Sequence, residues 1–66
     1  MKNSLRIARA IANITQAELA LAIGVSRQTI NAVEAGKYVP STVLALKMAR
    51  ELQKEVKELF ELEEED

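Results

Sequence analysis

Residues 15–36 read TQAELALAIGVSRQTINAVEAG, and this stretch decides the fold. Thr15 followed three residues later by Glu18 is a capping box, which is typical of a helix start. Gly24 comes nine residues after Thr15, and glycine is the usual residue just past a helix end. Ser26 can cap a second short helix, which Gly36 ends in the same way. The stretch therefore predicts two short helices joined by a tight turn.

The apolar residues of these two helices are spaced so that they face inward together. A small residue, Ala20, stands where the second of the two helices crosses closest to the first. Two helices joined by a turn of about four residues around a glycine form a helix-turn-helix motif. Its expected inward-facing residues are Leu19, Ile23, Val25, Ile30 and Val33.

The rest of the chain predicts three more helices and almost no strand, so that the fold class is all-α in a single domain over residues 1–66. Asn3 or Ser4 can cap a helix that runs to about Ala12, and Asn13 suits a positive φ. Pro40 disfavours helical geometry at Val39, so residues 37–41 are expected to form a connector, and Ser41 can cap a helix over 42–52. A break at 53–55 is expected before a helix over 56–60, with one continuous helix as the alternative. The acidic tail, 61–66, either frays or forms a brief strand with Phe60 and Leu62 on one face.

Length and composition exclude several classes of function. The chain has 66 residues with no Cys and no His, so disulfides, ordinary zinc sites and catalysis by Cys/His or Ser/His are excluded, and we expect no enzyme, metal or cofactor. A domain of this size buries on folding only about 60% of the surface that its unfolded chain exposes, so a binding partner that covers more of the surface is expected. No apolar run is long enough for a membrane span and no signal peptide is evident, so we expect a cytoplasmic protein without a membrane.

The net charge of −1 conceals a strongly divided chain. Residues 1–50 carry seven Lys or Arg and two acids, a net charge of +5. Residues 51–66 carry two Lys and eight acids, a net charge of −6. A basic body with an acidic tail indicates polyanion binding by the body. Tyr38 and Phe60 are the only aromatic residues, so no stacking platform for single strands exists and duplex DNA is favoured.

The sequence resembles the lambda-repressor-like, Cro-type helix-turn-helix domains of the Xre family over roughly residues 4–60. The resemblance implies a compact five-helix fold with the motif at helices two and three, binding of double-stranded operator DNA as a homodimer, and regulation of transcription, most readily repression. Departures from the family pattern occur at Asn13, Thr42 and 53–55. The matching segments are Thr15-Gln16-Ala17-Glu18-Leu19-Ala20, Ile23-Gly24-Val25-Ser26-Arg27-Gln28-Thr29-Ile30, Glu34-Ala35-Gly36-Lys37-Tyr38, Pro40-Ser41 and Ala45-Leu46-Lys47-Met48-Ala49.

The resemblance also assigns roles to individual residues. Arg27 and Gln28, followed by Asn31 and Ala32, lie at expected base-reading positions, because Arg can bond guanine, Gln can bond adenine and Ala offers a methyl contact to thymine. The start of a helix suits a phosphate group, and the remaining polar positions resemble backbone contacts. The expected phosphate contacts are Arg9, Thr15, Gln16, Ser26, Thr29, Lys37, Tyr38 and Ser41.

Two further expectations concern packing. The resemblance pairs Arg9 with Glu34 as a structural ion pair, with two unrelated exposed charges as the alternative. The C-terminal part holds more apolar surface than a short helix pair needs, so it is expected to supply part of the core and a dimer seam. The residues expected in the seam are Leu44, Leu52, Val56, Phe60 and Leu62.

Other functions stay open at this level. An antitoxin or a controller of a restriction system would reuse the same fold. A helix-turn-helix bundle that binds another protein and not DNA is the alternative from a different class. An engineered origin of the alanine-rich sequence is also open.

Overall fold

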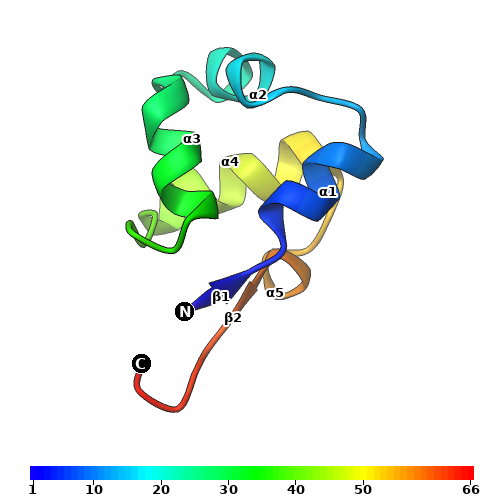
Figure 1. Ribbon diagram of the computed structural model, residues 1–66. Coiled ribbons are helices and arrows are strands. Elements are labelled where there is room, and N and C mark those ends of the chain that lie inside the picture. The colour runs from blue at the N-terminus through cyan, green and yellow to red at the C-terminus, as the bar shows by residue number, and fades with distance from the viewer.

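The computed structural model describes residues 1–66 and has five helices and a small two-stranded sheet (Figure 1). The all-α prediction, with the helix-turn-helix at α2 and α3, is confirmed. The elements in chain order are β1 (Lys2–Asn3), α1 (Leu5–Ile11), α2 (Gln16–Ile23), α3 (Arg27–Glu34), α4 (Thr42–Leu52), α5 (Val56–Leu59) and β2 (Phe60–Glu61).

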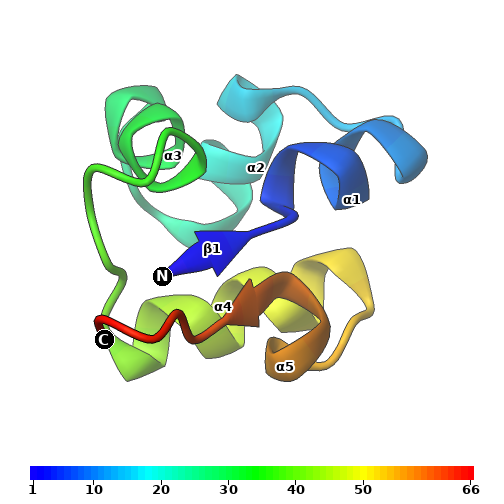
Figure 2. The same cartoon turned by 60° about the horizontal axis from the view of Figure 1, so that its bottom comes forward.

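The helices form two groups around one core. In Figure 2, α1, α2 and α3 lie above α4 and α5, and β1 lies at the front between them. Every helix contributes to a cluster of 13 buried apolar side chains. The largest fully buried ones are Leu5, Leu19, Ile30, Met48, Leu59 and Val33. Four of the five inward-facing residues predicted for the motif are buried, and Val25 is half-buried against the core. None of the helices has the length and apolar character needed to cross a membrane.

The first four helices all end in the same way, with a residue at positive φ. The four residues are Asn13, Gly24, Gly36 and Gln53, with φ of 58, 77, 75 and 55°. After each one, the next amide donates to a carbonyl five residues back, as in Val25 N–H to Ala20 O at 3.0 Å and Lys54 N–H to Ala49 O at 2.9 Å. This bond is the Schellman closure of a helix C-terminus. The predicted positive φ at Asn13 is confirmed.

The predicted break between α4 and α5 is also present. Gln53 turns the chain in left-handed geometry, and α5 starts after Glu55. The carboxylate of Glu58 accepts a hydrogen bond from the Glu55 amide at 2.9 Å. A polar turn without glycine thus ends one helix and begins the next.

The sheet contains a strand that the sequence did not predict. β1 pairs antiparallel with β2, with Lys2 opposite Glu61 and Asn3 opposite Phe60. Lys2 Nζ lies 3.1 Å from Glu61 Oε1. A two-residue strand is too short to show an alternating pattern, so its pairing is visible only in the fold. Of the two alternatives for the tail, the brief strand is present as β2, but it ends at Glu61, so Leu62 does not share a strand face with Phe60. Phe60 is 9% exposed and Leu62 is 76% exposed.

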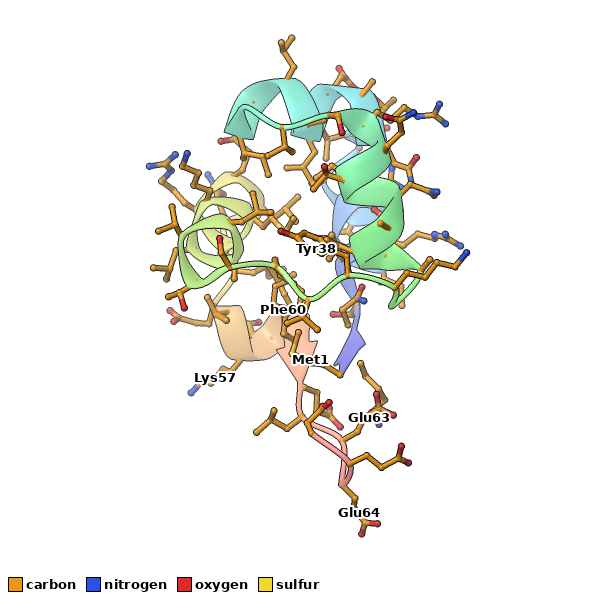
Figure 3. The ribbon with its side chains drawn as sticks, turned by 90° about the vertical axis from the view of Figure 1, so that its left-hand side faces the viewer. Met1, Tyr38, Lys57, Phe60, Glu63 and Glu64 are labelled. Carbon is orange, nitrogen blue, oxygen red and sulfur yellow. The ribbon has the colours of Figure 1, made fainter.

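The acidic tail folds back on the N-terminus and does not fray. The Met1 ammonium lies 2.9 Å from Glu63 Oε1 and 3.1 Å from Asp66 Oδ2. Hydrogen bonds to Glu63 and Asp66 raise the pKa of the Met1 amino group. Figure 3 shows Met1 between Phe60 and Glu63, with Glu64 at the far end of the tail.

Three of the five residues expected in a dimer seam belong to the core of the single chain. Leu44, Leu52 and Phe60 are 8, 6 and 9% exposed. This corrects the expectation that their side chains are available to a second subunit, because each packs inside its own molecule. Some apolar residues of these short helices lie in the core and others lie on the surface. Their spacing in the sequence does not distinguish the buried residues from the exposed ones. Val56 is half-buried and Leu62 is exposed, so these two remain accessible.

We expect Gln53→Gly to raise the free energy of unfolding by about 0.5 kcal/mol, since glycine removes the side-chain clash of left-handed geometry while its greater unfolded-state freedom offsets part of the gain. Gly24→Ala is the matched control. No atom lies within 4 Å of a Cβ built there, so its loss of about 1 kcal/mol comes from φ alone. Urea denaturation followed by circular dichroism measures both, and a destabilised Gln53→Gly variant contradicts the assignment.

Candidate nucleic-acid interface

The start of α2 is fixed by a reciprocal pair of hydrogen bonds. The Thr15 hydroxyl accepts from the Glu18 amide at 3.0 Å, and the Glu18 carboxylate accepts from the Thr15 amide at 2.9 Å. The predicted capping box is therefore confirmed. Hydrogen bonding to the Glu18 carboxylate, first from the Thr15 amide and then from the Thr15 side chain, lowers the pKa of Glu18. The Glu18 side chain is therefore engaged in capping the N-terminus of α2.

Two other predicted phosphate contacts also cap helices. Ser26 Oγ accepts from the Thr29 amide at 3.2 Å and lies 3.0 Å from Thr29 Oγ1. Ser41 Oγ accepts from the Leu44 amide at 3.1 Å, at the start of α4. A capping hydroxyl accepts with a lone pair, so the hydrogen of the Ser41 hydroxyl stays free to donate to an anion. Capping and phosphate contact are compatible at Ser41.

The first turn of α3 presents two long polar side chains to solvent. Arg27 and Gln28 are exposed, and no hydrogen bond or salt bridge within the chain engages either side chain. Asn31 is exposed one turn later, and Ala32 beside it is half-buried. The four residues predicted to read bases therefore lie on α3, and the side chains of Arg27 and Gln28 make no hydrogen bond or salt bridge within the chain.

The connector after α3 carries the remaining predicted contacts. Lys37 and Tyr38 are both exposed. Tyr38 lies between α3 and α4 (Figure 3), and it lines a shallow groove together with Val25, Ser41 and Lys47. The groove brings the turn of the motif, the connector and the start of α4 to one place.

The carboxylate of Glu34, the last residue of α3, is the centre of the site. Its Oε2 accepts from Arg9 Nε at 2.7 Å, and its Oε1 accepts from Gln16 Nε2 at 2.9 Å. Arg9 Nη2 and Arg6 Nε lie 3.3 and 3.4 Å from Oε1. The predicted pair of Arg9 and Glu34 is present, and it is part of a larger cluster.

The cluster is buried at its centre. The Glu34 side chain is 0% exposed and that of Arg9 is 15% exposed. Burial by itself would raise the pKa of Glu34, but the hydrogen bonds from Arg9 and Gln16, the charge of Arg9 and the Arg6 contact outweigh it, and the pKa is lowered. Its stabilising contribution is present above the usual glutamate pKa of about 4.3 and is lost as pH falls through the lowered value.

Arg9 also fixes the segment between α1 and α2. Its Nη1 donates to the Ile14 carbonyl at 3.0 Å, directly before the Thr15 cap. Its Nε, Nη1 and Nη2 thus all bond within the chain. Arg9 therefore acts mainly as a structural group, and less of it is available to a phosphate than the sequence suggested.

Two residues at the site were not identified from the sequence. Arg6 contacts Glu34 while its side chain stays 68% exposed, so it lies at the solvent-facing edge of the cluster. Asn3 Nδ2 donates to the Val33 carbonyl at 2.9 Å, which joins the N-terminus to the end of α3. The three-residue spacing of Arg6 and Arg9 on one helix is the sequence signal that could have identified Arg6. No sequence pattern identifies the contact of Asn3.

No group of three or more His, Cys, Asp or Glu side chains is placed to hold a metal ion. The acidic tail lies on the opposite side of the molecule from α2 (Figures 1 and 3). The carboxylates of the tail therefore stay away from the start of the motif.

Comparison with known proteins shows which families and structures the chain resembles. The model of the family described as "Helix-turn-helix" matches residues 5–59. An uncharacterized HTH-type transcriptional regulator, MJ0272 of Methanocaldococcus jannaschii, is 47% identical over 66 residues, which cover all of both chains. The uncharacterized HTH-type transcriptional regulator YgzD of Bacillus subtilis is 42% identical, again over the full length of both.

Two solved structures share the fold. The restriction-modification controller protein C.AhdI from Aeromonas hydrophila superposes with a TM-score of 0.78 and 38% identity, covering 85% of each chain. The hypothetical transcription factor NHTF from Neisseria gives a TM-score of 0.76 with 28% identity, covering 82% of this chain and 61% of the other.

We expect Arg9→Met to lower the free energy of unfolding by about 3 kcal/mol, because it removes a partner from a buried carboxylate. Arg6→Met is the matched control, because its side chain is mostly exposed, and it should cost less than about 1 kcal/mol. Chemical denaturation of the two variants measures the difference. Equal losses would mean that Glu34 does not depend on Arg9 in particular.

Proposed function

The chain belongs to the helix-turn-helix family of transcriptional regulators, and from this premise we propose that it is a repressor that binds a specific pseudo-palindromic operator as a homodimer. The observation that carries the proposal is the pair of unengaged side chains of Arg27 and Gln28 on the first turn of α3. Such side chains at the start of the second motif helix reach base edges in the major groove. Arg27 is suited to guanine and Gln28 to adenine.

Phosphate contacts would hold this helix in register. The candidates surround it: the start of α2 at Thr15, the start of α4 at Ser41, and Lys37 in the connector. Arg6 adds an exposed guanidinium at the edge of the Glu34 cluster. Contacts of this kind set position and affinity and leave sequence choice to α3.

A restriction-system controller is the second candidate. It is supported by the likeness to C.AhdI over 85% of both chains. Genes for a restriction endonuclease and a methyltransferase beside this gene would favour it, and their absence would count against it.

We expect duplex DNA binding to weaken steeply with salt, because each neutralised phosphate releases counterions. Arg27→Ala with Gln28→Ala should relax sequence choice, at about 1–3 kcal/mol of discrimination for each side chain. Lys37→Ala, as the control, should weaken binding to every sequence alike and reduce the salt slope by about one. Fluorescence anisotropy on a site selected from random duplexes measures all three. An unchanged base preference in the double variant would refute the reading role.

In the proposed homodimer, the α3 helices of the two subunits would lie about 34 Å apart on the operator. Val56 and Leu62 are the accessible residues of the expected seam, and Val56 lines an apolar groove with Leu46 of α4. Leu46 is 56% exposed, so Leu46→Glu should leave the monomer folded and break the dimer. Leu21→Glu, at an 85% exposed site on α2, should leave the dimer intact. Light scattering shows the mass, and a wild-type protein that stays monomeric on its operator contradicts the proposal.

A further inference from the structure

The Glu34 cluster extends to the outer face of α3 through two side-chain amides. Gln16 Nε2 donates to Glu34 Oε1 at 2.9 Å, and the same nitrogen lies 3.3 Å from Asn31 Oδ1. An amide NH₂ group has two hydrogens, one for each of these acceptors. Three residues from α2 and α3 thus form one hydrogen-bonded chain.

The orientation of both amides follows from the chemistry of Glu34. An ionised carboxylate only accepts hydrogen bonds, so the Gln16 atom that faces it must be the nitrogen. A nitrogen with two hydrogens needs an acceptor at its second contact, so the Asn31 atom that faces it must be the oxygen. The Asn31 oxygen is therefore turned towards α2, and its NH₂ group is directed away.

We propose that Gln16 is a positioning residue that fixes the amide of Asn31, so that Asn31 reads the operator through its NH₂ group. This inference rests on the proposed function. A free asparagine can turn its amide over and offer either a donor or an acceptor to a base. Held by Gln16, it offers a donor, which selects base edges with an acceptor there: purine N7, guanine O6 or thymine O4.

The buried pair of Arg9 and Glu34 gives this arrangement its rigidity. Glu34 is 0% exposed and Arg9 holds both of its oxygens, so the acceptor that Gln16 contacts cannot swing away. Gln16 is itself half-buried. The base-reading face of α3 is thereby joined to the α1–α2 connection. The role differs from the phosphate contact expected for Gln16 from the sequence.

The test compares base preference with overall affinity. After a preferred site is selected from random duplexes, anisotropy is measured on that site and on every single-base substitution within a half-site. Gln16→Met keeps the length of the side chain and removes its donor, so discrimination at one position should fall roughly tenfold, the scale of one amide–base contact. Gln16→Lys can donate to both Glu34 and Asn31 and should retain most of that discrimination.

Asn31→Asp tests the same inference at an exposed position, where folding is not at risk. It keeps the oxygen that faces Gln16 and replaces the outward NH₂ by an acceptor. The preference should change at the same position as in Gln16→Met, towards a base that presents an amino group, cytosine N4 or adenine N6. Thermal unfolding confirms that each variant is folded.

Two results would overturn the inference and leave the proposed function standing. One is a Gln16→Met variant that binds all sequences more weakly by the same factor, as expected for a phosphate contact alone. The other is an Asn31→Asp variant with the wild-type base preference at every position. A wild-type protein without any sequence preference for duplex DNA overturns both the inference and the proposed function.

Discussion

The buried carboxylate of Glu34 is the interaction on which the rest of the structure depends. It stands at the end of α3 and receives hydrogen bonds from Arg9 in α1 and Gln16 at the start of α2. These hydrogen bonds hold α1, α2 and α3 together at the Glu34 carboxylate. A buried charge without partners is strongly unfavourable, so losing this arrangement would destabilise the fold. The same contacts set the direction in which α3 faces solvent.

Closing the ends of this small domain adds to the stability that its apolar core provides. Pairing of β1 with β2 and the bond from Asn3 to the Val33 carbonyl join both termini to the end of α3. Each of the first four helices ends in a left-handed residue with a bond five residues back, which satisfies carbonyls that a short helix leaves open. Because the helices have only 4 to 11 residues, these ends form a large part of the structure.

The sequence was informative where the controlling contacts are local. The Thr15 and Glu18 capping box, the turn at Gly24 and the start of α3 at Ser26 are recognised by residues within four positions of each other. The base-reading candidates and the pair of Arg9 with Glu34 followed from the family resemblance. The contacts of Gln16 with Asn31 and of Asn3 with Val33 join distant positions and leave no periodic signal. The burial of Leu44 and Phe60 likewise depends on how the helices pack.

Charge placement explains how a chain with a net charge of −1 can approach a polyanion. Part of the acidic segment is neutralised by the N-terminus, since the Met1 ammonium contacts both Glu63 and Asp66. The tail also lies opposite α2 (Figure 1). At physiological salt, exposed charges act over only about 8 Å, and the long axis of the molecule is 32 Å. The motif therefore experiences the charges of its own neighbourhood, where Arg27 and Lys37 are unpaired and the acids Glu18 and Glu34 are engaged in hydrogen bonds.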